Sequence, residues 1–228
     1  MKIYTIPNLI TLGNLACGIL GIIFVFDGDL QMGSKLMLLA LFLDFLDGFV
    51  ARMFNMGSDI GKQLDSLADM VTFGVLPSFI LYFLLKNISG INPYLTYFPI
   101  ILAAASALRL AKFNIDERQS DSFIGLPTPA NGMVVATFPF LISEPGIAQQ
   151  LLQNQWIIIG YVLLFSFLLN AEIPLFALKF KDFSWKKNNI KYLFLAGSII
   201  ILGFIQLAAI PLIILAYILI SFIFKSKI

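Results

Sequence analysis

The chain has 228 residues, of which 59% are hydrophobic and only 12% are charged, whereas a soluble globular domain carries about 25% charged residues. This composition, with a mean hydropathy of +0.92, excludes an ordinary soluble protein and predicts one integral membrane domain over residues 1–228. The net charge of +2 gives no reason to expect nucleic acid as a partner, the absence of histidine excludes histidine-based catalysis, and the single cysteine allows no internal disulfide.

The first long apolar run, about residues 9–26, follows Pro7, and proline favours the first turn of a helix. Asn8, Thr11 and Asn14 recur every three residues and lie on or near one face of this predicted helix. Polar side chains in a membrane helix need partners. Two interpretations stay open: hydrogen bonds to neighbouring helices, or contacts with a bound nucleotide or diphosphate.

Four aspartates interrupt the second and third apolar runs, residues 33–54 and about 58–85. A charge at the centre of a membrane helix costs roughly 2.5–3.5 kcal/mol. We therefore expect these carboxylates to be compensated by a bound partner. The four residues are Asp44, Asp47, Asp65 and Asp69.

The spacing of the aspartates brings them together. Asp44 and Asp47 are three residues apart and Asp65 and Asp69 are four apart, so each pair shares a helix face. In an antiparallel hairpin over residues 33–86, the two pairs lie at matching depths. Such an all-oxygen cluster suits Mg²⁺ or Mn²⁺, and a cluster this acidic could hold two ions.

Small residues share these faces. Gly48 and Ala51 each follow an aspartate by four residues, and Gly61 precedes one by four, which leaves space beside the cluster. Arg52 could pair with a phosphate. A buried network of ion pairs or a metal-free proton relay is the alternative, but one arginine cannot balance four carboxylates and the small residues would then have no purpose. Pro77 is expected to kink the helix over about residues 58–85 one turn or more beyond the aspartates.

The chain reads Asp44-x-x-Asp47-Gly48-x-x-Ala51-Arg52, then eight residues, then Gly61-x-x-x-Asp65-x-x-x-Asp69. This pattern resembles the signature of the CDP-alcohol phosphatidyltransferase family at every specified position. The resemblance implies a membrane enzyme that moves a phosphatidyl group from a CDP-linked lipid to an alcohol and releases CMP. It further implies a membrane-buried homodimer, and with the acidity of the cluster it predicts Mg²⁺ or Mn²⁺ as the cofactor, with two ions per site.

The same resemblance implies roles for individual residues. The first three aspartates bind metal, and Asp69 is the general base and also a candidate ligand. The opening Pro7-Asn8-x-x-Thr11-x-x-Asn14 is similar to the family's first helix, which favours contacts of its polar face with the nucleotide or diphosphate. The predicted contacts of the CDP-lipid are Asn8, Thr11, Gly48, Ala51, Arg52 and Gly61.

Further apolar runs follow at about residues 94–112, 127–142 and 156–178. The last apolar region, residues 192–224, exceeds one span of about 20 residues. Because Gln206 and Pro211 fall near its middle, we expect it to split into a hairpin of two short helices. The predicted fold is an all-α membrane protein with about eight transmembrane helices, a six-helix catalytic core and a C-terminal hairpin.

Positive charges predict the orientation, because cytoplasmic segments of membrane proteins are enriched in Lys and Arg. With eight spans and a cytoplasmic N-terminus, only Lys35 and Lys86 of the 15 cations face the other side. Both termini and the aspartates are therefore expected on the cytoplasmic side of the cell membrane. The cytoplasmic cations are Lys2, Arg52, Lys62, Arg109, Lys112, Arg118, Lys179, Lys181, Lys186, Lys187, Lys191, Lys225 and Lys227.

A second motif bears on the acceptor alcohol. Arg109 and Lys112 lie three apart near a predicted helix end, where they either obey the positive-inside rule or bind an anionic group of the acceptor. The segment Arg109-Leu-Ala-Lys-Phe-Asn114 and the later Gly125-Leu-Pro127-Thr-Pro-Ala resemble the phosphatidylserine synthase branch of the family. This resemblance makes L-serine the expected acceptor, bound by Arg109, Lys112, Asn114 and Pro127.

Three functions compete at this point. The expected one is metal-dependent transfer from CDP-diacylglycerol, or a CDP-archaeol-type lipid, to serine. Glycerol 3-phosphate or inositol phosphate could instead be the acceptor, since the chain has further cations for a phosphate. A cation transporter is the alternative from a different class, but transporters commonly have two related halves, and here no matching half follows the aspartate hairpin.

Overall fold

The computed structural model describes residues 3–116, 123–175 and 185–223. The predicted cytoplasmic cations at positions 2, 118, 179, 181, 225 and 227 lie outside these residues, and so do the side chains of Lys186 and Lys187. The described chain is helical apart from two short strands, which matches the expected all-α class.

The first two helices begin where the sequence places capping residues. α1 (Ile6–Phe26) follows Thr5, whose hydroxyl accepts a hydrogen bond from the Asn8 amide, and it has proline in its first turn. α2 (Leu30–Met53) follows Asp29, which caps the Met32 amide at 2.8 Å. The two helices pack along each other, so α1 lies beside the helix that bears the first two aspartates.

The third run forms one continuous helical rod with an irregular middle. α3 (Asp59–Asp69) is capped by Ser58 and leads into a π-helical stretch, η1 (Met70–Val75), and then α4 (Leu76–Lys86). Pro77, where a kink is predicted, lies in the first turn of α4, so the irregularity precedes it and starts directly after Asp69. π-Helical turns are rare and often occur at functional sites.

The remaining elements follow the predicted apolar runs, with one correction. The run expected over residues 156–178 ends as a helix at Asn170, because residues 174–175 form a strand. The residue before Pro174 is disfavoured in helical conformation. These elements are η2 (Pro93–Tyr97), α5 (Ile100–Ile115), β1 (Phe123–Ile124), α6 (Thr128–Leu141), α7 (Ile147–Leu152), α8 (Gln155–Asn170), β2 (Pro174–Leu175), α9 (Trp185–Ile205), η4 (Gln206–Ala208) and α10 (Ala209–Ile223).

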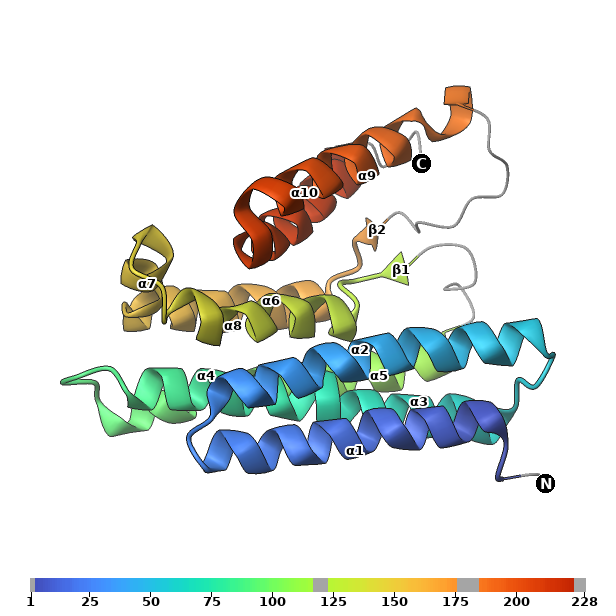
Figure 1. Cartoon of the computed structure of the whole chain (residues 1–228), viewed down its shortest axis with the longest axis horizontal. Coiled ribbons are helices and arrows are strands. Elements are labelled where there is room, and N and C mark those ends of the chain that lie inside the picture. The colour runs from blue at the N-terminus through green and yellow to red at the C-terminus, as the bar shows by residue number, and fades with distance from the viewer. Residues whose placement is uncertain (1–2, 117–122, 176–184, 224–228) are drawn as a thin grey trace.

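The helices lie roughly parallel or antiparallel in three tiers (Figure 1). α1, α2, the α3–α4 rod and α5 form one tier, α6 and α8 lie above it, and α9 with α10 forms the outermost tier. The buried core joins the first two tiers through side chains such as Leu76, Ile80 and Val135, each 0% exposed. β1 pairs antiparallel with β2 and ties the start of α6 to the end of α8.

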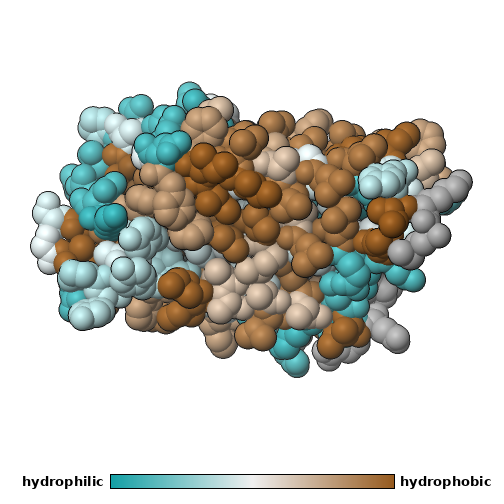
Figure 2. All heavy atoms as spheres, turned by 90° about the horizontal axis from the view of Figure 1, so that it is seen from below, coloured by the Kyte–Doolittle hydropathy of each residue, from teal (hydrophilic) through white to brown (hydrophobic). Residues whose placement is uncertain are grey.

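Within the described residues, four stretches are long and apolar enough to cross a membrane: Ile6–Phe26, Asp59–Lys86, Pro93–Ile115 and Asn188–Ile223. The last of these is broken at Gln206, which has a positive φ of 48°. Figure 2 shows an apolar belt between two hydrophilic ends on the face seen there, as expected for a protein in a bilayer. These observations do not test the expected number of eight spans or their orientation, and both remain predictions.

Candidate active site

Three aspartates form a compact cluster between α2 and α3. One carboxylate oxygen each from Asp44, Asp47 and Asp65 lies within 4.8 Å of the others. Asp44 and Asp65 come from different helices and lie close enough for their charges to interact. Asp47 is only 6% exposed, and the other two are partly buried. The predicted convergence of the aspartates thus holds for these three in the structure.

Asp69 lies beside this cluster and has different neighbours. Its side chain is 7% exposed, and its Oδ1 accepts a hydrogen bond of 3.4 Å from Nδ2 of Asn14 on α1. Its charge interacts with those of Asp44 and Asp65 on one side and of Arg109 on the other. Asp69 therefore lies where the acidic cluster meets α5.

Helix α1 orients the acidic cluster through its polar face. The Thr11 hydroxyl donates to Asp47 Oδ2 at 2.5 Å, in a buried contact between α1 and α2. Asn14 contacts Asp69 as described, and its backbone carbonyl accepts from the Thr72 hydroxyl in η1 at 3.3 Å. Of the two interpretations open for this face, the structure supports contacts with neighbouring helices at both positions.

A pocket of about 240 Å³ opens next to the cluster. Its walls include five of the six residues predicted for the CDP-lipid; Arg52 is exposed, does not line the pocket and folds back towards Gly48. A methyl group at Gly61 would stand 3.0 Å from Asn8 Oδ1, so the small residue keeps this wall open. The pocket is lined by Pro7, Asn8, Thr11, Asp47, Gly48, Ala51, Met56, Gly57, Ser58, Gly61, Lys62 and Asp65.

Arg109 is the only predicted acceptor residue for which the structure gives an interaction with an aspartate of the site. Its guanidinium is buried, with 6% of the residue exposed, and lies 5.1 Å from the centroid of the Phe113 ring. Its Nε has no hydrogen-bond partner among the described residues. A buried cationic donor that lacks a partner is costly, so an anionic group brought by a ligand would satisfy it.

The other predicted acceptor residues are placed differently. Lys112 is exposed on α5. Asn114 is engaged with α3, where its side chain contacts Ser66 and Gln63. Pro127 precedes α6 in a turn fixed by a bond from the Leu126 amide to a carbonyl of α8. The described contacts do not join these three residues to Arg109 in one cluster.

Sequence reasoning singled out Asn14 but did not connect it to Asp69, and it missed Lys62 and Ser58 as pocket residues. Asn14 and Asp69 are 55 positions apart, so only the packing of α1 on the α3–α4 rod reveals the contact. For Lys62, its place directly after Gly61 was an available signal.

Comparison with known proteins gives consistent matches. The model of the CDP-alcohol phosphatidyltransferase family matches residues 4–168. The chain is 41% identical over 139 residues to the CDP-diacylglycerol–serine O-phosphatidyltransferase of Bacillus subtilis (strain 168). These 139 residues are 59% of this chain and 75% of that protein. It is 32% identical over 207 residues to the Helicobacter pylori (strain J99) protein of the same name, with 90% and 83% covered. An archaetidylserine synthase of Methanothermobacter thermautotrophicus is 36% identical over 136 residues, 58% of this chain and 57% of that protein.

Proposed function

Because the chain belongs to the CDP-alcohol phosphatidyltransferase family, we propose that it transfers a phosphatidyl group from CDP-diacylglycerol, or a CDP-archaeol-type lipid, to the hydroxyl of L-serine. The products are phosphatidylserine, or its ether-lipid counterpart, and CMP. The observation that carries this proposal is the cluster of Asp44, Asp47 and Asp65 with Asp69 beside it, next to an open pocket. The names of the relatives support serine as the acceptor.

The acidic cluster fits one or two divalent cations. Its donors are carboxylate oxygens from two helices, the ligand type preferred by Mg²⁺ and Mn²⁺. Asp44, Asp47 and Asp65 would hold the metal, with Asp69 as a candidate further ligand. When bound, the metal supplies Lewis-acid neutralisation of the diphosphate and of the departing CMP.

The pocket is proposed to bind the CDP end of the lipid. Its walls combine the small residues Gly48, Ala51 and Gly61 with the polar side chains Asn8 and Thr11. We expect the small residues to admit the nucleotide close to the cluster. Arg52 is exposed at this end of α2 and could reach a phosphate only by turning away from Gly48.

Asp69 is proposed as the general base. In the transfer, the serine hydroxyl oxygen forms a bond to the lipid's phosphorus, the bond from that phosphorus to CMP breaks, and the hydroxyl proton passes to the Asp69 carboxylate. A carboxylate is a weak base, so it acts on a proton that is already becoming acidic in the transition state. Arg109, close enough to interact with Asp69, would bind the serine carboxylate and aim the hydroxyl.

The test is CMP release by the purified protein with CDP-diacylglycerol and Mn²⁺ or Mg²⁺. Serine, glycerol 3-phosphate and inositol phosphate are offered separately, and a chelator is the control. Release that needs serine and is lost on chelation is expected. Release with a phosphorylated polyol instead would keep the aspartate assignment and overturn serine as the acceptor, whereas metal binding without any release would favour a cation transporter.

A further inference from the structure

The first turns of α3 are held against α5 by polar side chains. The buried residues of α3 are Ser66, Ala68 and Asp69, while the apolar Leu67 is 64% exposed. The half-buried Ile60 and Leu64 line up with Ala68 at intervals of four residues, and α3 packs mainly along α1. The side-chain contacts that the structure gives between α3 and α5 are instead polar or cation–π. Because α3 bears two of the four aspartates, whatever holds it also sets the geometry of the site.

Asn114, near the end of α5, makes most of these polar contacts. Its Oδ1 accepts a hydrogen bond from the Ser66 hydroxyl at 3.1 Å, and its Nδ2 donates to Gln63 Oε1 at 3.2 Å. Its backbone carbonyl accepts from Lys62 Nζ at 3.0 Å. Both ends of the Asn114 amide and its backbone thus face α3.

The aromatic ring of Phe113 adds a second connection. Lys62 Nζ lies 6.0 Å from its centroid, and the Arg109 guanidinium lies 5.1 Å from it. Both distances are in the range of cation–π attraction. Lys62 also lines the proposed nucleotide pocket, so the Phe113 ring contacts one residue proposed for each substrate site.

These contacts occur at successive levels of two antiparallel helices (Figure 1). Asp69 and Arg109, whose charges interact, mark one level of this helix pair. Ser66 precedes Asp69 by three residues and Asn114 follows Arg109 by five, about 4.5 and 7.5 Å along the two axes. Since the helices run in opposite directions, both displacements point the same way, towards the end where α3 begins. The Ser66–Asn114 hydrogen bond therefore joins the two helices one to two turns away from Asp69 and Arg109.

We propose that Asn114 is a positioning residue that fixes α3 against α5 and so keeps the Asp69 carboxylate at a constant distance from Arg109. This inference rests on the proposed function of those two residues. It replaces the role suggested by the sequence, in which Asn114 contacts the acceptor. A misplacement of about 1 Å between reacting groups can cost a hundredfold in rate, so this contact acts on turnover more than on binding.

The test is a double-mutant cycle with Ser66→Ala and Asn114→Leu, measured as kcat and KM for serine and for the CDP-lipid. Each single variant is expected to lose about ten- to a hundredfold in kcat, with KM for the CDP-lipid nearly unchanged. The double variant should be no worse than Asn114→Leu alone. Asn114→Asp should retain activity within a few-fold, because a carboxylate accepts from Ser66 and from a turned Gln63 amide. Asn87→Leu, at an exposed asparagine after α4, is the matched control.

Other results would overturn the proposed positioning role of Asn114. Full activity of Ser66→Ala, together with a raised KM for serine alone in Asn114→Leu, would mean that Asn114 contacts the acceptor. Additive losses, or losses that follow a fall in Tm without rescue by Asn114→Asp, would also overturn it. If the unaltered protein uses another acceptor, the proposed function fails and the cycle is measured with that acceptor. If the protein releases no CMP at all, the Tm values of the same four proteins test the contact between Ser66 and Asn114. Additive decreases in Tm would then contradict the proposal.

Discussion

At the scale of single residues, the four aspartates differ in their surroundings, and this difference separates their proposed roles. Asp44, Asp47 and Asp65 face one another, whereas Asp69 is buried between Asn14 and the side of the bundle that bears Arg109. A base must be free of other strong ligands and close to the acceptor. If Arg109 binds the acceptor, as proposed, Asp69 meets the second condition better than the other three.

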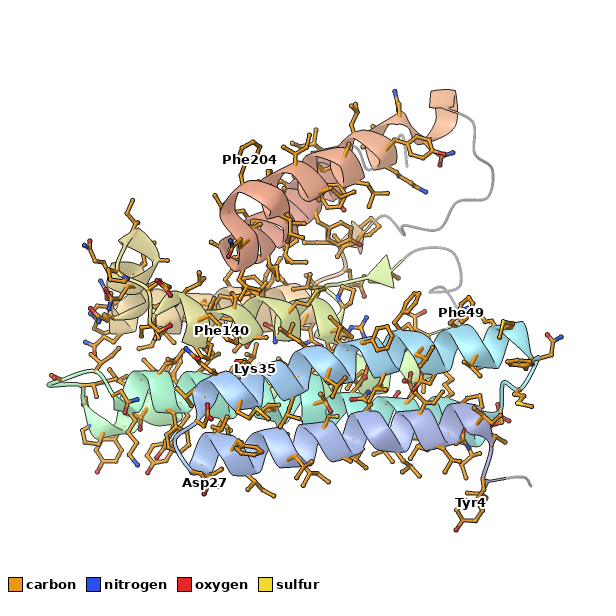
Figure 3. All side chains as sticks on the ribbon, viewed as in Figure 1. Tyr4, Asp27, Lys35, Phe49, Phe140 and Phe204 are labelled. Carbon is orange, nitrogen blue, oxygen red and sulfur yellow. The ribbon has the colours of Figure 1, made fainter. Side chains whose placement is uncertain are left out.

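Replacing Asp69 by Asn tests this division. We expect Asp69→Asn to lower kcat by about 10²–10⁴, the usual contribution of general-base catalysis, while Mn²⁺ binding and thermal stability are largely kept. CMP release and metal titration of the same sample measure the two effects. Asp27→Asn, at the opposite end of α1 in Figure 3, is the control. Loss of metal binding in Asp69→Asn would assign Asp69 mainly to the metal.

Thr11 is expected to act on the metal through Asp47. Thr11→Val removes the 2.5 Å hydrogen bond that orients this carboxylate but keeps the shape of the side chain. Partners that orient a metal ligand typically contribute about 10–100-fold in affinity or activity, so the Mn²⁺ concentration needed for half-maximal activity should rise at least several-fold. Thr11→Ser, which keeps the hydroxyl, should behave like the unaltered protein. An unchanged metal requirement would leave Thr11 as a nucleotide contact only.

Arg109 is expected to decide the affinity for the acceptor. Arg109→Ala removes the buried guanidinium, whose Nε has no hydrogen-bond partner among the described residues, and should raise KM for serine far more than KM for the CDP-lipid. Arg109→Lys keeps the charge without the bidentate geometry, so an intermediate KM is expected. Steady-state kinetics with each substrate varied in turn measures both values. Equal increases for both substrates would give Arg109 a structural role.

Much of this residue-level picture follows from the sequence, because helical spacing is a local property. The cluster of Asp44, Asp47 and Asp65 needs only their spacing and one hairpin. The Asn14–Asp69 contact and the engagement of Asn114 by Ser66 depend on which helices become neighbours, and a single sequence does not contain that information.

At the scale of elements, η1 connects the active site to the packing of α1. A methyl group at Gly18 would stand 3.1 Å from the Cα of Thr72, so α1 and η1 approach closely there. The same stretch of α1 bears Asn14, whose carbonyl bonds Thr72. The π-helical geometry that begins after Asp69 is therefore enclosed by α1. The sequence predicts a kink at Pro77, but it contains no recognised signal for the π-helical stretch before it.

Substitution at Gly18 tests this contact. Gly18→Val forces the two elements apart, and overpacking of this kind costs about 1–3 kcal/mol, so Tm should fall. We expect kcat to fall as well, because Asn14 moves with the helix. Gly160→Ala is the matched control, since a methyl group there meets nothing within 4 Å. Normal activity and Tm in Gly18→Val would show that the close approach is dispensable.

At the scale of the whole molecule, the aspartates lie towards one end of the apolar belt. Figure 3 labels Tyr4 and Asp27 at opposite ends of α1, and the aspartate pocket lies towards the Tyr4 end, where Pro7 and Asn8 line it. α2 is long enough to span, although every 18-residue window in it contains at least three of Lys35, Asp44, Asp47 and Arg52. If α2 spans the membrane, as the sequence predicts, hydropathy alone undercounts the spans because the aspartates lower the hydropathy of this helix. The family resemblance implies a homodimer, and light scattering of the protein in detergent would measure whether one forms.

The orientation of the belt can be measured by cysteine labelling. Cys17 is the chain's single cysteine and is buried, so a variant with Cys17→Ser gives a clean background. Ile115→Cys lies at the exposed end of α5 on the side of the aspartates, and Ser89→Cys lies in the exposed turn after α4, at the other end. If the positive-inside pattern sets the orientation, a membrane-impermeant maleimide added to intact cells should label Ser89→Cys and spare Ile115→Cys until the membrane is opened. The reverse pattern would place the aspartates outside, away from the compartment that supplies nucleotide-activated lipids, and labelling of both from outside would contradict a belt that separates the two ends.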